Sequence, residues 1–117
     1  MADKKELPLA MARVFVEYTD EDHWLSTKEL TKILEDEYGL TAERRTIYAN
    51  IDLLKEYGYD ISTWQENGVG YYLKSHRFSP EEVNWMIGQI KSESPFPARR
   101  RKEMAKIFKS MISKYQR

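Results

Sequence analysis

Apolar residues recur at helical spacing through the first 58 positions of the chain, with polar residues between them. From Leu7 to Tyr18 they fall at i, i+4, i+7, i+8 and i+11, which predicts a first helix. A second predicted helix begins at Ser26, because Ser26 and Glu29 have capping-box spacing. It ends at Gly39, since glycine accepts the left-handed conformation that a helix end favours.

A third predicted helix begins with Thr41 as its cap and ends at Gly58. The connection between the second and third helices, Gly39-Leu40-Thr41, has the length of the short joint in a helix-turn-helix. The inward side chains of the third helix are expected to be Ile47, Ile51 and Leu54.

The apolar period changes after the third helix. The segment ISTWQENGVGYYL is rich in residues that favour strands. Asn67-Gly68 within it is a strong hairpin signal, because both residue types accept positive φ. The pattern predicts a two-stranded ribbon over residues 60–66 and 69–74.

Two further helices are predicted after the ribbon, separated by the breaker SESPFP. Ser79-Pro80-Glu81-Glu82 opens the first of them with another capping-box pattern. Their apolar stripes are predicted to form a homodimer interface, and the alternative is that the last helix folds back to complete the core of a monomer. The interface residues would be Val83, Met86, Ile87, Ile90, Met104, Ile107, Phe108, Met111, Ile112 and Tyr115.

This order of elements is typical of a winged helix-turn-helix. The expected fold class is mainly α with a small β-hairpin: a winged helix-turn-helix domain over residues 1–77. A C-terminal helical linker and dimerisation segment would follow over residues 78–117.

The charge of the chain is zero overall but unevenly distributed. Residues 99–117 hold eight Lys or Arg and one acid, net +7, which leaves −7 for residues 1–98. An acidic body does not bind nucleic acid through bulk charge, so any DNA contact there needs a local basic patch. The basic last helix admits three interpretations: a solvated face on a dimer helix, a phosphate-binding face, or a membrane-surface helix, of which the last is the least favoured.

The third helix supplies the candidate patch. With Ile47 at the centre of its buried face and 100° per residue, its first turns present Arg45 and Ala49 outward, with Arg44 on the flank. An Arg fork can read guanine in the major groove, while Thr or Tyr hydroxyls can bond phosphates. The alternative is that the two arginines pair with acids such as Glu43. The predicted DNA-contacting residues are Thr41, Arg44, Arg45, Thr46, Tyr48 and Ala49, with Lys74 and Arg77 of the wing.

The segment TAERRTIYANIDLLKEYGYDI (residues 41–61), with TDEDHWLSTKEL before it and GVGYYL after it, resembles a known family. It is similar to the N-terminal region of WYL-type bacterial transcriptional regulators, whose helix-turn-helix is related to the DeoR-type winged one. The resemblance implies DNA binding. The sequence departs from the family at Ala49 and Asn50, where many members have Arg and Asp. It also stops before the ligand-sensing WYL domain of the family, so we expect either a fragment of a longer regulator or a naturally short one. The matching residues are Thr41, Arg44, Arg45, Thr46, Ile47, Tyr48, Ile51 and Leu54.

The sequence gives little indication of metal binding, catalysis or membrane association. There is no cysteine, and of the two histidines, His23 and His76, only His23 has further candidate ligands, Asp20 and Asp22, which indicate a metal site only weakly. No Ser-His-Asp set or glycine-rich phosphate loop occurs, so we expect no enzyme activity, no metal and no cofactor. No apolar run approaches the roughly 18–20 residues of a membrane span, and the N-terminus lacks a signal-peptide core. We therefore expect a cytoplasmic protein with no membrane partner.

The predicted function is sequence-specific binding of double-stranded DNA as a transcriptional regulator. The third helix would enter the major groove and the wing would contact the DNA backbone. The rival hypothesis, which the acidic body and Ala49 keep open, is a protein-interaction module that uses the same fold to bind another protein.

Overall fold

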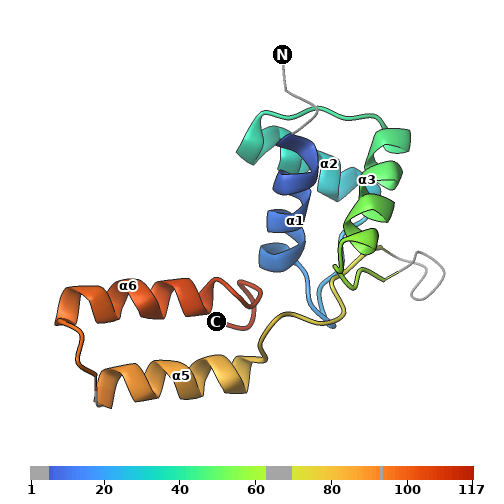
Figure 1. Ribbon diagram of the computed structural model, residues 1–117. Coiled ribbons are helices and arrows are strands. Elements are labelled where there is room, and N and C mark those ends of the chain that lie inside the picture. The colour runs from blue at the N-terminus through green and yellow to red at the C-terminus, as the bar shows by residue number, and fades with distance from the viewer. Residues whose placement is uncertain (1–5, 63–69, 93) are drawn as a thin grey trace.

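The computed structural model describes residues 6–62, 70–92 and 94–117 of the chain. This part contains α-helices in two groups, a three-helix unit and a two-helix hairpin (Figure 1). The three-helix unit comprises α1 (Glu6–Tyr18), α2 (Thr27–Tyr38) and α3 (Arg44–Glu56), and the hairpin comprises α5 (Pro80–Ser92) and α6 (Ala98–Lys109).

The core of the three-helix unit is centred on α1, which packs against both α2 and α3. Each helix contributes the apolar stripe that its sequence predicts, so the buried faces converge and the polar faces remain exposed. Leu40, in the connection between α2 and α3, is also buried. The fully or almost fully buried side chains include Met11, Phe15, Leu30, Leu34 and Ile47.

The ends of α2 are as predicted. Ser26 Oγ accepts a hydrogen bond from the Glu29 N–H (3.1 Å), and the Glu29 carboxylate accepts one from the Ser26 N–H (3.0 Å), which completes a capping box. Gly39 terminates the helix with φ +64°, in the left-handed region that glycine adopts without strain.

The predicted start of α3 is wrong by two residues. The N-cap is Glu43, in an extended conformation and with no side-chain cap bond, rather than Thr41. Thr41 lies outside the helix and is exposed. The first-turn N–H groups of α3 are therefore left without a side-chain acceptor of this kind.

The prediction of a β-hairpin wing is wrong, because the described residues contain no pair of strands. Asn67-Gly68 and the rest of residues 63–69 lie outside them, and the flanking residues form isolated bridges, Ile61 with Leu73 and Leu25 with Tyr71, rather than strands.

The main-chain pairing around Ile61 and Leu73 is short. The Ser62 N–H donates to the Tyr72 carbonyl oxygen (2.8 Å) and the Lys74 N–H donates to the Asp60 carbonyl oxygen (2.7 Å), as in an antiparallel ladder. The Tyr72 N–H, however, donates to Ser62 Oγ (3.0 Å) and not to the main-chain carbonyl that a continued ladder would use. The Leu73 N–H points away from Ile61 and donates to Thr19 Oγ1 (2.9 Å), so within the described residues this pairing amounts to one bridge.

The two C-terminal helices form an antiparallel hairpin with its own small core (Figure 1). Ser79 and Glu82 make both bonds of the predicted capping box before α5, at 3.1 and 2.9 Å. Val83, Ile87 and Ile112 are buried inside this hairpin. These three predicted dimer residues therefore stabilise the single chain and are not exposed to a partner.

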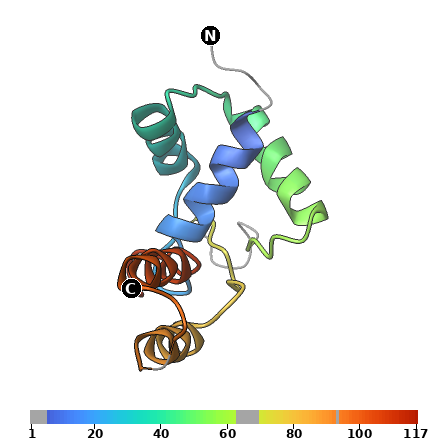
Figure 2. The same cartoon turned by 60° about the vertical axis from the view of Figure 1, so that its left-hand side comes forward.

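The segment after α6 returns to the three-helix unit, where it lies beside the C-terminal end of α1 (Figure 2). The Lys114 N–H donates to the Glu17 carbonyl oxygen at 2.7 Å, and Arg117 forms an ion pair with Glu17 at 3.6 Å. The Tyr115 ring stacks on His23 with a centroid distance of 3.7 Å. These contacts connect the two groups of helices.

Candidate nucleic-acid interface

The N-terminal ends of α2 and α3 meet at one surface depression of about 400 Å³. Two cationic side chains, Lys28 from α2 and Arg44 from α3, lie on its walls. Two tyrosines from different parts of the chain complete it. The lining residues are Thr27, Lys28, Arg44, Tyr48 and Tyr71.

The first turns of α3 present their side chains as predicted. Arg44, Arg45 and Ala49 are exposed, and Tyr48 is 40% exposed. Ile47 is fully buried on the opposite face, which fixes the rotation of the helix.

Thr46 and Asn50 lie at the border of this surface and are half-buried. Asn50 Nδ2 donates to the Thr46 carbonyl oxygen within the helix, at 2.9 Å. The Asn50 amide is thus already engaged along the helix.

The two arginines are not paired within the described part of the chain. Neither Arg44 nor Arg45 has an ion pair there, so the predicted alternative of a pair with Glu43 is not formed. Both guanidinium groups are available to a ligand, and so is the positive end of the α3 dipole.

Tyr71 is positioned by main-chain bonds to the loop before α2. Its N–H donates to the Leu25 carbonyl oxygen (2.7 Å), and its carbonyl accepts from the Leu25 N–H (2.9 Å). Its ring lies 6.5 Å from that of Tyr48. Burial, with smaller contributions from Tyr48 and Asp52, raises the pKa of the Tyr71 phenol, so the hydroxyl stays protonated at neutral pH.

The two predicted wing cations lie elsewhere. The Lys74 N–H bonds the Asp60 carbonyl oxygen at 2.7 Å, just beyond the end of α3. Arg77 lines a separate cavity of about 580 Å³ with Asp60 and Tyr57, also at that end. The 13 residues of α3 separate the helix ends by roughly 18 Å along its axis. Lys74 and Arg77 therefore do not join the surface formed at the start of α3.

Sequence reasoning missed three contributors to the depression: Thr27, Lys28 and Tyr71. The first two were detectable, because they occupy the first turn of a helix whose start the capping box marks. Tyr71 was not, since its position depends on the bridge to Leu25, and the sequence pattern alone does not place that contact.

The described residues contain no cluster of three His, Cys, Asp or Glu side chains that could hold a metal ion. Asp20 and His23 do meet, with His23 Nδ1 2.8 Å from the Asp20 carboxylate, but they stand with Ser113 rather than with a third ligand of these types. Within the same part of the chain, no helix is both long and apolar enough to cross a membrane.

The chain was compared with protein-family models, with curated proteins and with solved structures, and none of the three comparisons found a match. The resemblance to WYL-type regulators therefore depends only on the motif residues of the chain itself.

Proposed function

We propose that the protein binds double-stranded DNA in a sequence-dependent manner through the N-terminal turns of α3. The observation that carries the proposal is the convergence of Lys28, Arg44 and Tyr48 at the junction of α2 and α3, with Arg45 and Ala49 exposed on the next positions. Cations that form no ion pair within the described residues, hydroxyl groups and a helix N-terminus without a side-chain cap together form a surface that suits phosphates and base edges.

Each side chain has a distinct role in this proposal. Arg45, which points most directly outward, reads a base edge, most favourably guanine O6 and N7. Arg44 and Lys28 contact phosphates on either side of the groove, and the tyrosine hydroxyls donate to further phosphates. Ala49 offers a small apolar contact, for example to a thymine methyl group.

The acids of α3 limit how the helix enters the groove. Asp52 and Glu56 are exposed further along the helix, where they would repel the DNA backbone. Only the first two turns are therefore inserted, and the helix axis is tilted away from the duplex towards its C-terminal end.

The biological role that suits such binding is regulation of transcription, in agreement with the resemblance to the DNA-binding region of WYL-type regulators. That role implies a cytoplasmic protein acting on duplex DNA. The rival role, binding of another protein through the same surface, predicts no dependence on DNA sequence.

The test is selection of bound duplexes from a random DNA library, followed by affinity measurements at 50 and 200 mM salt. We expect an enriched motif and a log–log salt slope of about −2 to −5, because each phosphate contact contributes about −0.9. DNA from the region upstream of the protein's own gene serves as a second library. Absence of both an enriched motif and a salt dependence would exclude DNA binding and favour the protein-interaction role.

A further inference from the structure

The α5–α6 hairpin carries a basic groove of about 420 Å³ that the proposed function does not use. Small side chains, Ala98 and Ala105, separate the cations that line it. The lining cations are Lys91 of α5 and Arg101, Lys102, Lys106 and Lys109 of α6.

The charge of this groove is not compensated within the described part of the chain. None of its five cations has an ion pair there. Glu103, the only acid among residues 98–109, pairs with Arg99 at 3.9 Å and Arg100 at 3.0 Å instead. Like charges one turn apart destabilise a helix, so a bound polyanion would relieve a repulsion that the chain leaves in place.

The cations form a row along the helix. Arg101 and Lys109 are separated by roughly 12 Å along the axis of α6, at about 1.5 Å per residue. A strand of duplex DNA places a phosphate roughly every 3.4 Å along its axis, so the row spans about three to four phosphates. A linear array of negative charge is the chemistry that such a row suits.

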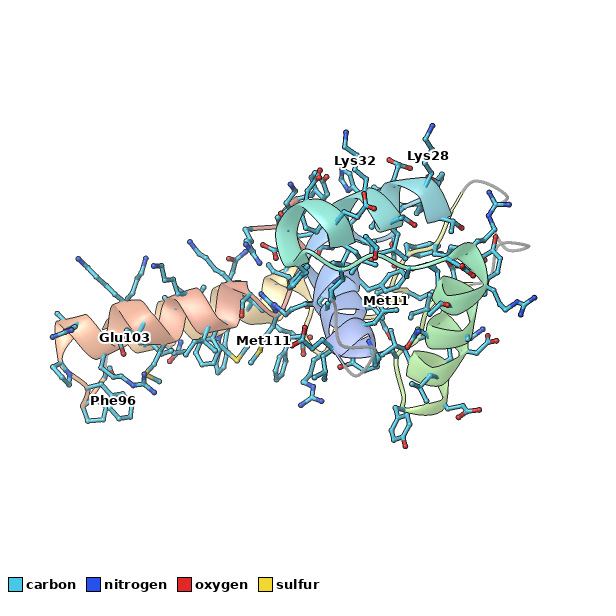
Figure 3. The ribbon with its side chains drawn as sticks, turned by 90° about the horizontal axis from the view of Figure 1, so that it is seen from above. Met11, Lys28, Lys32, Phe96, Glu103 and Met111 are labelled. Atoms are coloured by element: carbon cyan, nitrogen blue, oxygen red, sulfur yellow. The ribbon has the colours of Figure 1, made fainter. Side chains whose placement is uncertain are left out.

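The molecule is long enough for one duplex to reach both the groove and the α2–α3 surface. Figure 3 shows nitrogen-ended side chains along α6 and, at the other end of the molecule, Lys28 of α2, whereas Phe96 lies on the opposite side of α6 from several of these. The Cα trace is 49 Å long in its longest dimension, which corresponds to roughly 14 base pairs of duplex. A duplex of that length spans the distance between the two surfaces.

We propose that this groove binds backbone phosphates of the DNA that flanks the base pairs contacted by α3; the inference rests on the proposed function. The body of the chain carries net −7 over residues 1–98, so the first turns of α2 and α3 supply little long-range attraction. The basic tail, net +7, supplies it. An anionic membrane is the less suitable partner for the groove, because Ala105, Phe108 and Ile112, the apolar side chains on the α5-facing side of the hairpin, are already packed against α5 and cannot insert into a bilayer.

The experiment compares two variants that each remove two positive charges from α6. Lys102→Gln with Lys106→Gln changes the groove, and Arg99→Gln with Arg100→Gln changes cations outside it. All four side chains are exposed, so both variants should fold, which circular dichroism checks. The probe is the duplex enriched by selection, with about ten base pairs added at each end, titrated from 50 to 200 mM salt.

We expect the groove variant to have a log–log salt slope shallower than that of the wild type by about 2, with unchanged base preference, because phosphate contacts carry no sequence information. The Arg99/Arg100 variant should change the slope by less than half as much. Equal slopes for the two variants would overturn the assignment. It would also be overturned if phosphatidylserine vesicles bound through the groove while the slope on DNA was unchanged.

Failure of the two proposals can be told apart. A wild type that enriches no motif, yet binds any duplex with a slope that the groove variant reduces, would remove sequence reading by α3 and support the groove. An enriched motif for the wild type, together with a salt slope that the groove variant leaves unchanged, would support sequence reading by α3 and exclude the groove.

Discussion

Gly70 lies where the chain leaves no room for a side chain. A Cβ at this position would be 2.6 Å from the Leu25 carbonyl oxygen and 2.7 Å from its carbonyl carbon, both backbone atoms. The neighbouring Tyr71 exchanges two main-chain bonds with the same Leu25. The absent side chain of Gly70 is thus what allows the two segments to pair and Tyr71 to reach Tyr48.

We expect Gly70→Ala to lower the free energy of unfolding by about 1–3 kcal/mol, since the overlap forces the backbone segments apart. Gly88→Ala is the matched control: Gly88 lies within α5 with no atom within 4 Å of an added Cβ, so it should gain up to about 1 kcal/mol from helix propensity. Urea unfolding measures both changes. Equal effects of the two substitutions would contradict the steric argument.

Arg45 is the residue on which sequence reading depends in the proposed function. Arg45→Ala should weaken binding to the selected duplex by about 1–3 kcal/mol and relax the preference at one base pair. Lys55→Ala, a charge loss at the exposed C-terminal end of the same helix, is the control and should leave the preference unchanged. Competition titrations against duplexes with single base changes separate the two effects; an unaltered profile for Arg45→Ala would remove it from the groove.

At the scale of elements, a buried carboxylate is one of the groups that attach the segment after α6 to the three-helix unit. Asp20 is 4% exposed and accepts hydrogen bonds from Ser113 Oγ, from His23 Nδ1 and from the Asp22 N–H. Burial alone would raise the pKa of the Asp20 carboxyl, but these donors, Ser113 first, hold it below its ordinary value. The ionised form therefore stabilises the attachment.

This attachment predicts a pH dependence. A lowered folded-state pKa means that the stabilisation by Asp20 is fully present above its unfolded value, about 4, and is lost as the pH falls through the lower folded value. Ser113→Ala, which removes one donor, should lower the free energy of unfolding by about 1.5–3 kcal/mol at pH 7 and by less at pH 2. Ser110→Ala is the control: the Ser110 hydroxyl bonds the Ile107 carbonyl oxygen, so its loss should lower the free energy of unfolding by the same amount at pH 7 and at pH 2. Chemical unfolding across this pH range is the measurement, and a constant cost for Ser113→Ala would refute the role of the charge.

The elements differ in how far the sequence predicts them. The helices and the ends of α2 follow from short-range patterns, since a capping box and a positive-φ glycine act within a few residues. The prediction of the wing was wrong, because β-propensity and a turn signal do not reveal that the Ser62 side chain, and not a main-chain carbonyl, accepts the hydrogen bond of the Tyr72 N–H. Arg44 and Arg45 were found from helical phase, whereas Tyr71 depends on a contact with a distant loop.

At the scale of the whole molecule, α6 separates two kinds of surface. Advancing 100° per residue from Ala105, which packs on α5, places the groove cations Lys102 and Lys109 on one flank and Ile107 on nearly the opposite one. Met104, one turn before Ile107, shares the flank of Ile107. A partner that covers the apolar flank would leave the basic groove open to DNA.

We propose that a second copy of the chain covers this flank. Ile107 is 49% exposed beside the half-buried Met104, and an exposed apolar ridge of this kind favours association. A dimer would also present two α3 helices to two half-sites, which strengthens the modest affinity expected of one. Light scattering after size exclusion should give a mass near 28 kDa, twice the 14.0 kDa of the chain.

The variant that tests this interface must avoid the internal core. Ile112 is buried within the hairpin, so a charge there would unfold the chain rather than separate two copies. Ile107→Asp places the charge on the exposed ridge and should yield folded monomers with weaker binding to the selected duplex. Trp85→Asp is the control, because Trp85 is 65% exposed and, by helical phase, points away from the α5 face that packs on α6. It should remain a dimer. A wild type that elutes as a 14.0 kDa monomer at tens of micromolar would end the proposal, and dissociation by Trp85→Asp alone would move the interface to α5.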